Sequence, residues 1–180
     1  MLKSILASIL IGFGAAVLLI LGNPLGPVLF AFGLLGVCYL QADLFTGKTG
    51  YYWRNKKIEL ATILGINLVS GWGIGFLLSI ANSDLTQKAL DKVQTWQWGL
   101  PHFIQAVACG MIMYICVDLY KKGTNFGIFY GVPLFIFCGF QHCIANAIYL
   151  GMAHTFSSVL FLCILGNFVG GVIANLLSEA

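Results

Sequence analysis

Residues 139–146 read Gly-Phe-Gln-His-Cys-Ile-Ala-Asn, and they interrupt an otherwise apolar run with a glutamine, a histidine and an asparagine. A second interruption, Gln-Ala-Asp-Leu-Phe-Thr-Gly, occupies residues 41–47. Polar side chains inside an apolar span are costly unless they line a cavity or pair within the protein. Broken helices also leave free backbone groups and aim their end dipoles at the middle of a membrane. Interruptions at matching places in two halves of a chain therefore indicate a transport site.

The composition predicts an all-α membrane protein. Hydrophobic residues make up 59% of the 180 residues, and charged residues make up 8%, against about 25% in soluble proteins. Such a chain lacks the polar surface that water requires, so lipid is the expected solvent. We predict one domain over residues 1–180 and no nucleic-acid partner, because the basic residues flank apolar segments instead of forming a soluble platform.

Six apolar segments have lengths near those needed to cross a bilayer. They lie at about 4–22, 26–43, 58–81, 99–119, 126–150 and 155–178. The first has no clear signal-peptidase site and is interpreted as a spanning helix. The polar stretch 82–98 is expected to form an amphipathic helix at the membrane surface, with Trp96 and Trp98 as interfacial anchors.

The basic residues predict the orientation. With the N-terminus inside, seven of the nine fall on inner segments and two on the connector 82–98. The inner ones are Lys3, Lys48, Arg54, Lys56, Lys57, Lys121 and Lys122, and the outer ones are Lys88 and Lys92. Because positive charge favours the cytoplasmic side, we expect both termini in the cytoplasm and the protein in a bacterial inner membrane.

A repeat at an offset of 100 residues relates the two halves of the chain. The matching pairs are Leu34 and Leu134, Cys38 and Cys138, Gln41 and Gln141, Asn67 and Asn167, Val69 and Val169, and Gly71 and Gly171. Three spans in each half make the repeat inverted. We therefore predict six helices in two inverted repeats, about 1–81 and 99–180, joined by the linker 82–98. The second and fifth helices are broken, as in an aquaporin-like architecture.

Three segments carry a family resemblance. Ala42-Asp43-Leu44-Phe45-Thr46-Gly47 resembles the A-[DE]-L-F-T-G loop of the formate/nitrite transporter family, and residues 139–146 resemble its G-F-E-H-S-I-A-N signature. Leu165-Gly166-Asn167-Phe168-Val169-Gly170-Gly171 resembles the L-G-N-x-x-G-G of its sixth helix. The resemblance implies a homopentamer of six-helix protomers. Each protomer would have its own pore for formate, nitrite, hydrosulfide or a similar monovalent species.

The resemblance also implies site residues. Thr46 is expected in the loop that breaks the second helix, facing the pore histidine His142. Leu44 and Phe45 would form a hydrophobic constriction on one side of this pair. Phe30, Leu34 and Phe135 match the opposite, cytoplasmic constriction. Asn146 belongs to the pore segment, and Asp43, Asn67 and Asn167 are expected to support the two breaks.

Two positions depart from the family pattern. A lysine that members carry before the fourth helix is replaced by Trp98, and an asparagine within that helix is replaced by Tyr114. Lys92 or Lys88 could supply the missing positive charge.

The histidines and the acid each have a plain structural alternative. His142 could be a buried histidine bonded to a backbone carbonyl, but ionisable residues inside a membrane are usually functional, which favours the pore role. His102 and His154 lie near span ends and are expected at the interface. Asp43 could be a pore charge, although a cap on the broken helix is the favoured interpretation.

The leading functional hypothesis is a channel for a small monovalent anion or its weak acid. Apolar constrictions would exclude the bare anion, and a proton exchanged through His142 would convert it to a neutral acid. The alternative is a neutral-solute channel for water, ammonia or urea, although paired Asn-Pro-Ala motifs are absent. An enzyme is not expected, since His142, Asp43 and Asp118 are scattered. No metal or cofactor is predicted.

Overall fold

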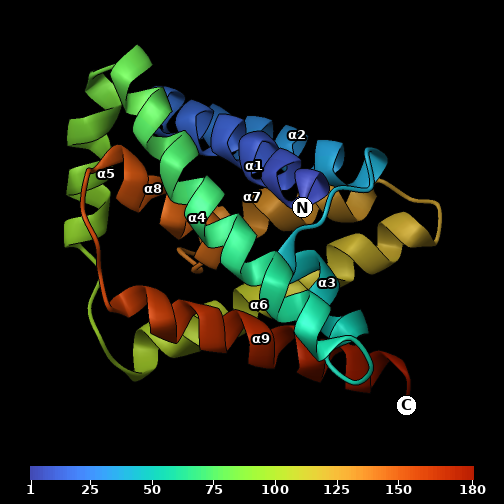
Figure 1. Cartoon of the computed structure of the whole chain (residues 1–180). Helices are drawn as coiled ribbons and strands as arrows, with labels where there is room; N and C mark the ends of the chain where they lie inside the picture. The colour runs from blue at the N-terminus through green and yellow to red at the C-terminus, as the bar shows by residue number, and fades with distance from the viewer.

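The computed structural model describes residues 1–180 as nine α-helices (Figure 1). In chain order these are α1 (Leu2–Leu21), α2 (Leu25–Tyr39), α3 (Phe45–Tyr52), α4 (Lys57–Ala81), α5 (Asp84–Gln94), α6 (Leu100–Lys121), α7 (Phe126–Phe137), α8 (Cys143–Met152) and α9 (Val159–Ser178). Four of them, α1, α4, α6 and α9, are long and apolar enough to cross a membrane. The all-helical class expected from the composition is confirmed.

Two apolar stretches each form a pair of short helices. α2 ends at Tyr39 and α3 begins at Phe45, while α7 ends at Phe137 and α8 begins at Cys143. Gln41 and Gly139, at matching places after α2 and α7, have φ angles of 50° and 69°. This left-handed conformation turns the chain out of the helix. Residues 41–44 and 139–142, which contain the polar side chains of the two interruptions, therefore lie in extended or turned backbone between helices.

The helix contacts follow one pattern in both halves of the chain. α1 packs against α2 and α4, and α6 packs against α7 and α9 in the same way. The short helices α3 and α8 each pack on a long helix of the other half, since α3 lies against α9 and α8 lies against α4. α2 and α7 pack against each other. Each short helix that follows a break is thus held by the last long helix of the other half.

Glycines allow the backbones to approach closely at these contacts. A Cβ atom added to Gly170 of α9 would meet the carbonyl oxygen of Val107 on α6, and one added to Gly151 of α8 would meet the carbonyl oxygen of Trp72 on α4. Small residues at helix crossings permit extensive van der Waals contact where lipid provides no hydrophobic drive for association. The glycines therefore fix the positions of α8 and α9.

The two ends of the bundle carry different elements. α5 lies at the left in Figure 1, and α3 and the C-terminus lie toward the right. At the right-hand end, Arg54 forms an ion pair with Glu179 at 3.1 Å, and the backbone N–H of Asp43 donates to the carbonyl of Lys3 at 3.1 Å. Both chain termini therefore lie at the α3 end, opposite α5.

The helix expected within residues 82–98 is present as α5. Its apolar residues Leu85 and Ala89 are buried, because α5 packs on α8 and α1. Trp96 packs edge-on against His102, with ring centroids 6.3 Å apart, and therefore contacts protein and is not a free interfacial anchor. Trp98 is 62% exposed and remains available for that role.

Close packing at Gly170 predicts that a larger side chain there destabilises the protein, whereas the same change at an open glycine does not. Gly170→Ala should destabilise the protein by about 1–3 kcal/mol, since the methyl group would overlap the backbone of α6. Gly65→Ala is the matched control, because no atom lies within 4 Å of the added Cβ and alanine favours helix. Thermal unfolding of the detergent-solubilised protein would measure both. Equal stability of the two variants would contradict the packing assignment.

Candidate functional site

The starts of α3 and α8 meet at a pair of buried side chains. His142 directly precedes α8, and Thr46 lies in the first turn of α3. His142 Nε2 and Thr46 Oγ1 are 2.9 Å apart, and each residue is at most 2% exposed. Helix N-termini carry a partial positive charge and unpaired N–H groups. Two such termini therefore flank this pair, which makes the location favourable for a small anion.

The hydrogen bonds of His142 define its tautomer. The backbone N–H of Ala145 donates to His142 Nδ1 at 3.1 Å, so Nδ1 is an acceptor. A neutral imidazole carries its single proton on the other nitrogen. We therefore assign the proton to Nε2, which donates to Thr46 Oγ1. The hydroxyl hydrogen of Thr46 then has no acceptor in the protein and can be donated to a solute.

Asn67 on α4 supports the break before α3. Its Oδ1 accepts a hydrogen bond from the N–H of Phe45 at 2.8 Å. Its Nδ2 donates to the carbonyls of Asp43 at 3.0 Å and Ser4 at 2.8 Å. One buried amide thus satisfies backbone groups on both sides of the break, and it caps α3 from outside the segment.

Asn167 on α9 makes the same bonds at the other break. Its Oδ1 accepts from the N–H of Cys143 at 2.8 Å, and its Nδ2 donates to the carbonyls of Gln141 and Ala106, both at 2.8 Å. Both asparagines are fully buried. They occupy the positions that the 100-residue repeat pairs, so the two breaks share one structural solution.

The expectation that Asp43 caps α3 is wrong. The helix has no side-chain cap at its start, and its first N–H is bonded to Asn67. The Asp43 carboxylate instead pairs with Lys48 at 3.2 Å. Its short side chain is thereby directed toward the basic group and away from the helix end.

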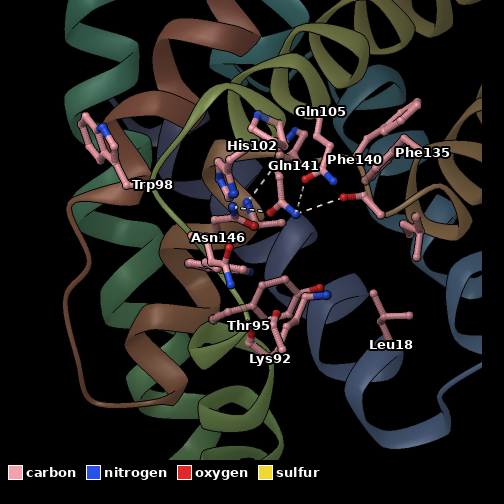
Figure 2. Close-up of a pocket in the computed structure, with 18 of the residues that line it drawn as sticks. Leu18, Lys92, Thr95, Trp98, His102, Gln105, Phe135, Phe140, Gln141 and Asn146 are labelled. Carbon is pink, nitrogen blue, oxygen red and sulfur yellow. Dashed lines mark hydrogen bonds between the residues drawn. The ribbon is translucent and has the colours of Figure 1, made fainter.

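A cavity of about 440 Å³ opens on the side of α5 and reaches His142; we call it the α5-side cavity. Its lining includes Lys92, His102, Gln105, Gln141 and Asn146 (Figure 2). Asn146 Nδ2 donates to Gln141 Oε1 at 3.0 Å, so these two amides form part of one wall.

Two aromatic rings narrow this cavity next to His142. Phe30 and Phe135 pack edge to face, with ring centroids 6.1 Å apart, and Phe135 stacks on His142 at 6.0 Å. Both rings line the cavity together with Lys92. Because these rings and Lys92 line one cavity, a cytoplasmic position for this constriction and an outer position for Lys92 cannot both hold. Leu34 is buried and lines neither this cavity nor the next.

A second cavity, of about 350 Å³, lies on the side of α3; we call it the α3-side cavity. Leu44, Gly47, Lys48 and Lys121 line it. Phe45 is buried beside it without lining it. The two cavities share no residue: His142 lines the α5-side cavity, whereas Leu44 and Gly47, on either side of Phe45 and Thr46 in the chain, line the α3-side cavity.

Comparison with known proteins shows which family the chain belongs to. The model of the formate/nitrite transporter family matches residues 1–179. The chain belongs to this family. The helices of suitable length and the family together make it an integral membrane protein of a transporter family.

Relatives and solved structures agree with the assignment. The chain is 28% identical to the "Uncharacterized transporter YwcJ" of Bacillus subtilis, over 81% of this chain and 69% of the relative. It is 27% identical to a "Probable formate transporter" of Methanothermobacter thermautotrophicus, over 84% and 74%. It shares its fold with a "Pentameric formate channel with formate bound" (TM-score 0.80, 16% identity, 98% and 92% covered) and an "FNT family ion channel" (TM-score 0.79, 18% identity, 98% and 85% covered).

Sequence reasoning missed His102 and Gln105 as cavity residues. His102 lies near the start of α6, as expected of a residue at a span end, but it is 5% exposed and lines the α5-side cavity. His102 and Gln105 are three residues apart on α6 and so share a helix face. That spacing of two polar residues in an apolar helix was the available signal. Lys92 also lines the cavity, and burial lowers its pKa.

The shared role of the two asparagines predicts that Asn167→Ala is severe. It removes three hydrogen bonds, two of them fully buried, and leaves the N–H of Cys143 unpaired, so the free energy of unfolding should fall by at least about 2 kcal/mol. Asn55→Ala, in an exposed turn, is the control and should be neutral within about 0.5 kcal/mol. Thermal unfolding in detergent would compare them; similar melting temperatures would refute the structural role.

Proposed function

We propose that the protein is a channel for a small monovalent anion or its conjugate weak acid, of the formate and nitrite type. The single observation that carries this is the His142–Thr46 pair at 2.9 Å, buried where two helix starts meet between two cavities. Family membership and a relative named as a probable formate transporter support the substrate class. Hydrosulfide belongs to the same class of small monovalent species.

The proposed architecture has six spans in two inverted repeats. α2 with α3 and α7 with α8 would each form one broken span between the four long helices. The equivalent helix contacts of the two halves and the equivalent bonds of Asn67 and Asn167 support this arrangement. We further propose a homopentamer, because the fold is shared with a channel described as pentameric and the long helices expose apolar side chains such as Val69, Phe161 and Leu165.

The apolar constriction formed by Phe30 and Phe135 determines what form of the solute passes. A bare anion must lose its hydration there and receives no replacement charge from two phenyl rings, which is costly. A neutral acid loses far less hydration energy. Because the Nε2–H of His142 donates to Thr46 Oγ1, the Thr46 hydroxyl hydrogen is left free as a hydrogen-bond donor for the solute beyond the rings.

Proton exchange at His142 would depend on occupancy. An imidazolium carries a proton on both nitrogens and cannot accept the hydrogen bond from Ala145 N–H, so protonation of the empty site sacrifices that bond. An anion against Nε2 offsets the loss by direct attraction to the positive charge. The histidine therefore gains and passes on a proton only when a substrate is present.

The proposal predicts the behaviour of His142→Asn. Asparagine keeps a hydrogen-bond donor of similar size but cannot exchange a proton. Formate flux into proteoliposomes should lose its pH dependence and fall at least tenfold at acidic pH, whereas Thr46→Val should reduce flux less severely. Stopped-flow measurement from pH 5 to 8, with formate, nitrite, hydrosulfide, acetate and urea, would test both variants.

The control is His154→Asn, since His154 lies outside both cavities and bonds to Ser79. It should retain the parental pH profile. An unchanged profile in His142→Asn, with the assembly intact, would make His142 structural and exclude proton exchange. Urea flux that ignores the anion gradient would instead indicate a neutral-solute channel.

Orientation is a separate expectation. Seven basic residues and both termini lie at the α3 end, so we expect this end in the cytoplasm of a bacterial inner membrane. A cysteine at position 88 of α5 should react with a membrane-impermeant maleimide from outside intact cells. A cysteine at position 55 should react only after permeabilisation. The reverse pattern would overturn the topology.

A further inference from the structure

Gln141 connects α6 to α8 at the residue directly before His142. Its Nε2 donates to the carbonyl of Gly139 at 3.0 Å and to Gln105 Oε1 on α6 at 3.4 Å. Its Oε1 accepts from Asn146 Nδ2 on α8 at 3.0 Å. Figure 2 shows Gln141 between Gln105 and Asn146 in the α5-side cavity, which all three residues line. Both polar groups of the Gln141 amide are therefore used within the protein.

The Gly139 carbonyl fixes which way the Gln141 amide points. A carbonyl oxygen can only accept a hydrogen bond, so the amide must present Nε2 to Gly139 and Oε1 to Asn146. An ionised glutamate at this position would have no donor, and it would place a negative oxygen against the Gly139 carbonyl and Gln105 Oε1. The G-F-E-H-S-I-A-N pattern that residues 139–146 resemble has this acid, whereas the bonds described here are complementary to a neutral amide.

The titratable groups around His142 include no carboxylate. Those that line its cavity are Lys92 from α5, His102 from α6 and Tyr149 from α8, while α1, α2, α4 and α7 contribute none. From α3, the hydroxyl of Thr46 faces the ring. The next residue of α8 is the buried thiol Cys143, which lies near those of Cys109 in α6 and Cys163 in α9.

The acids of the chain are held elsewhere. Asp43, the nearest of them in the chain to Thr46, pairs with Lys48 at 3.2 Å and lines neither cavity. The other five stand at positions 59, 84, 91, 118 and 179 and also line neither cavity. An imidazolium at His142 would therefore have no carboxylate of the protein to compensate its charge.

We propose that Gln141 is a positioning residue for proton exchange at His142: its hydrogen bonds keep a neutral amide beside the imidazole, so that the permeating anion is the one group able to compensate an imidazolium there. The inference rests on the proposed function and extends it to a residue outside the His142–Thr46 pair. The bond from Ala145 N–H opposes protonation of the empty site, and the lack of a fixed negative charge opposes it as well. Protonation is thereby reserved for the occupied site.

A carboxylate at position 141 should remove this condition. A negative charge beside His142 stabilises the imidazolium, so the ring binds its proton at a higher pH. An opposite charge at about 4–6 Å typically moves a titration by about 1–3 units. The carboxylate also repels an incoming anion, so the anion should increase the proton affinity of the ring less than it does in the parent protein.

The test is an NMR titration of His142 in Gln141→Glu, with isotopically labelled histidine, in detergent, with and without sodium formate. His142→Asn removes one of the three histidine signals and thereby assigns it. Without formate, the titration midpoint of His142 should rise by about 1 unit or more in Gln141→Glu. The further rise that formate produces should be less than half of the parental one. In proteoliposomes, the pH of half-maximal formate flux should move upward as well.

Three further variants separate charge from loss of packing. Gln97→Glu adds the same charge at an exposed residue of the same cavity, where water and salt screen it, so the midpoint should move by less than about 0.3 unit. Gln141→Met removes the hydrogen bonds without adding charge; it should lower the melting temperature but leave the midpoint within about 0.3 unit. The double variant Gln105→Leu/Gln141→Glu removes the acceptor that opposes the carboxylate, and it should show the raised midpoint even if the single variant does not fold.

The role of Gln141 and the channel function fail in different ways. Unchanged midpoints in both carboxylate variants would overturn the role of Gln141, whatever the flux of the parent protein. An equal rise in Gln97→Glu would overturn it too, because any charge in the cavity would then suffice. If no tested anion crosses the parent protein, the proposed channel function is wrong, while a raised midpoint in Gln141→Glu alone still supports Gln141 as the residue that denies His142 a fixed counter-charge.

Discussion

The structure depends on the way two buried asparagines replace helix hydrogen bonds. A bilayer offers no water to unpaired backbone groups, so a chain that leaves the helix within a span must find partners inside the protein. Asn67 and Asn167 supply them, each accepting from the first N–H of a short helix and donating to a carbonyl before it. Because these bonds are made, the starts of α3 and α8 can face each other, and His142 and Thr46 can meet. The position of the His142–Thr46 pair therefore depends on the hydrogen bonds that Asn67 and Asn167 make to the backbone at the two breaks.

Much of this arrangement could be predicted, because short sequence patterns indicate it. The interruptions at 41–47 and 139–146 mark the ends of α2 and α7, and the repeated Asn-x-Val marks the two supporting asparagines. The membrane class follows from the lack of charge. These features require only hydropathy, spacing and the cost of unpaired polar groups.

Other features depend on contacts that no local pattern specifies. The pairing of Asp43 with Lys48 could not be preferred over a cap without knowing that Asn67, 24 residues away, already holds the helix start. The side on which Phe30 and Phe135 lie follows from the packing of α5 over α8, which brings Lys92 into their cavity. Hydropathy likewise does not tell whether a histidine at a span end faces lipid or protein, and so it did not identify His102 as a cavity residue.

The packing of each short helix on a long helix of the other half restricts how the two halves can move relative to each other. α3 is attached to its own half by the chain but packs on α9 of the other, and α8 packs on α4 in the same manner. Carriers that alternate between two open states commonly rock one repeat against the other. Here such rocking would separate α8 from α4 at Gly151 and Trp72, where a backbone carbonyl approaches so closely that even a methyl group would not fit. The two halves are interlocked by these contacts, and in the proposed channel opening would fall to side-chain rotation of residues such as Phe30 and Phe135, on a timescale far shorter than that of domain motion.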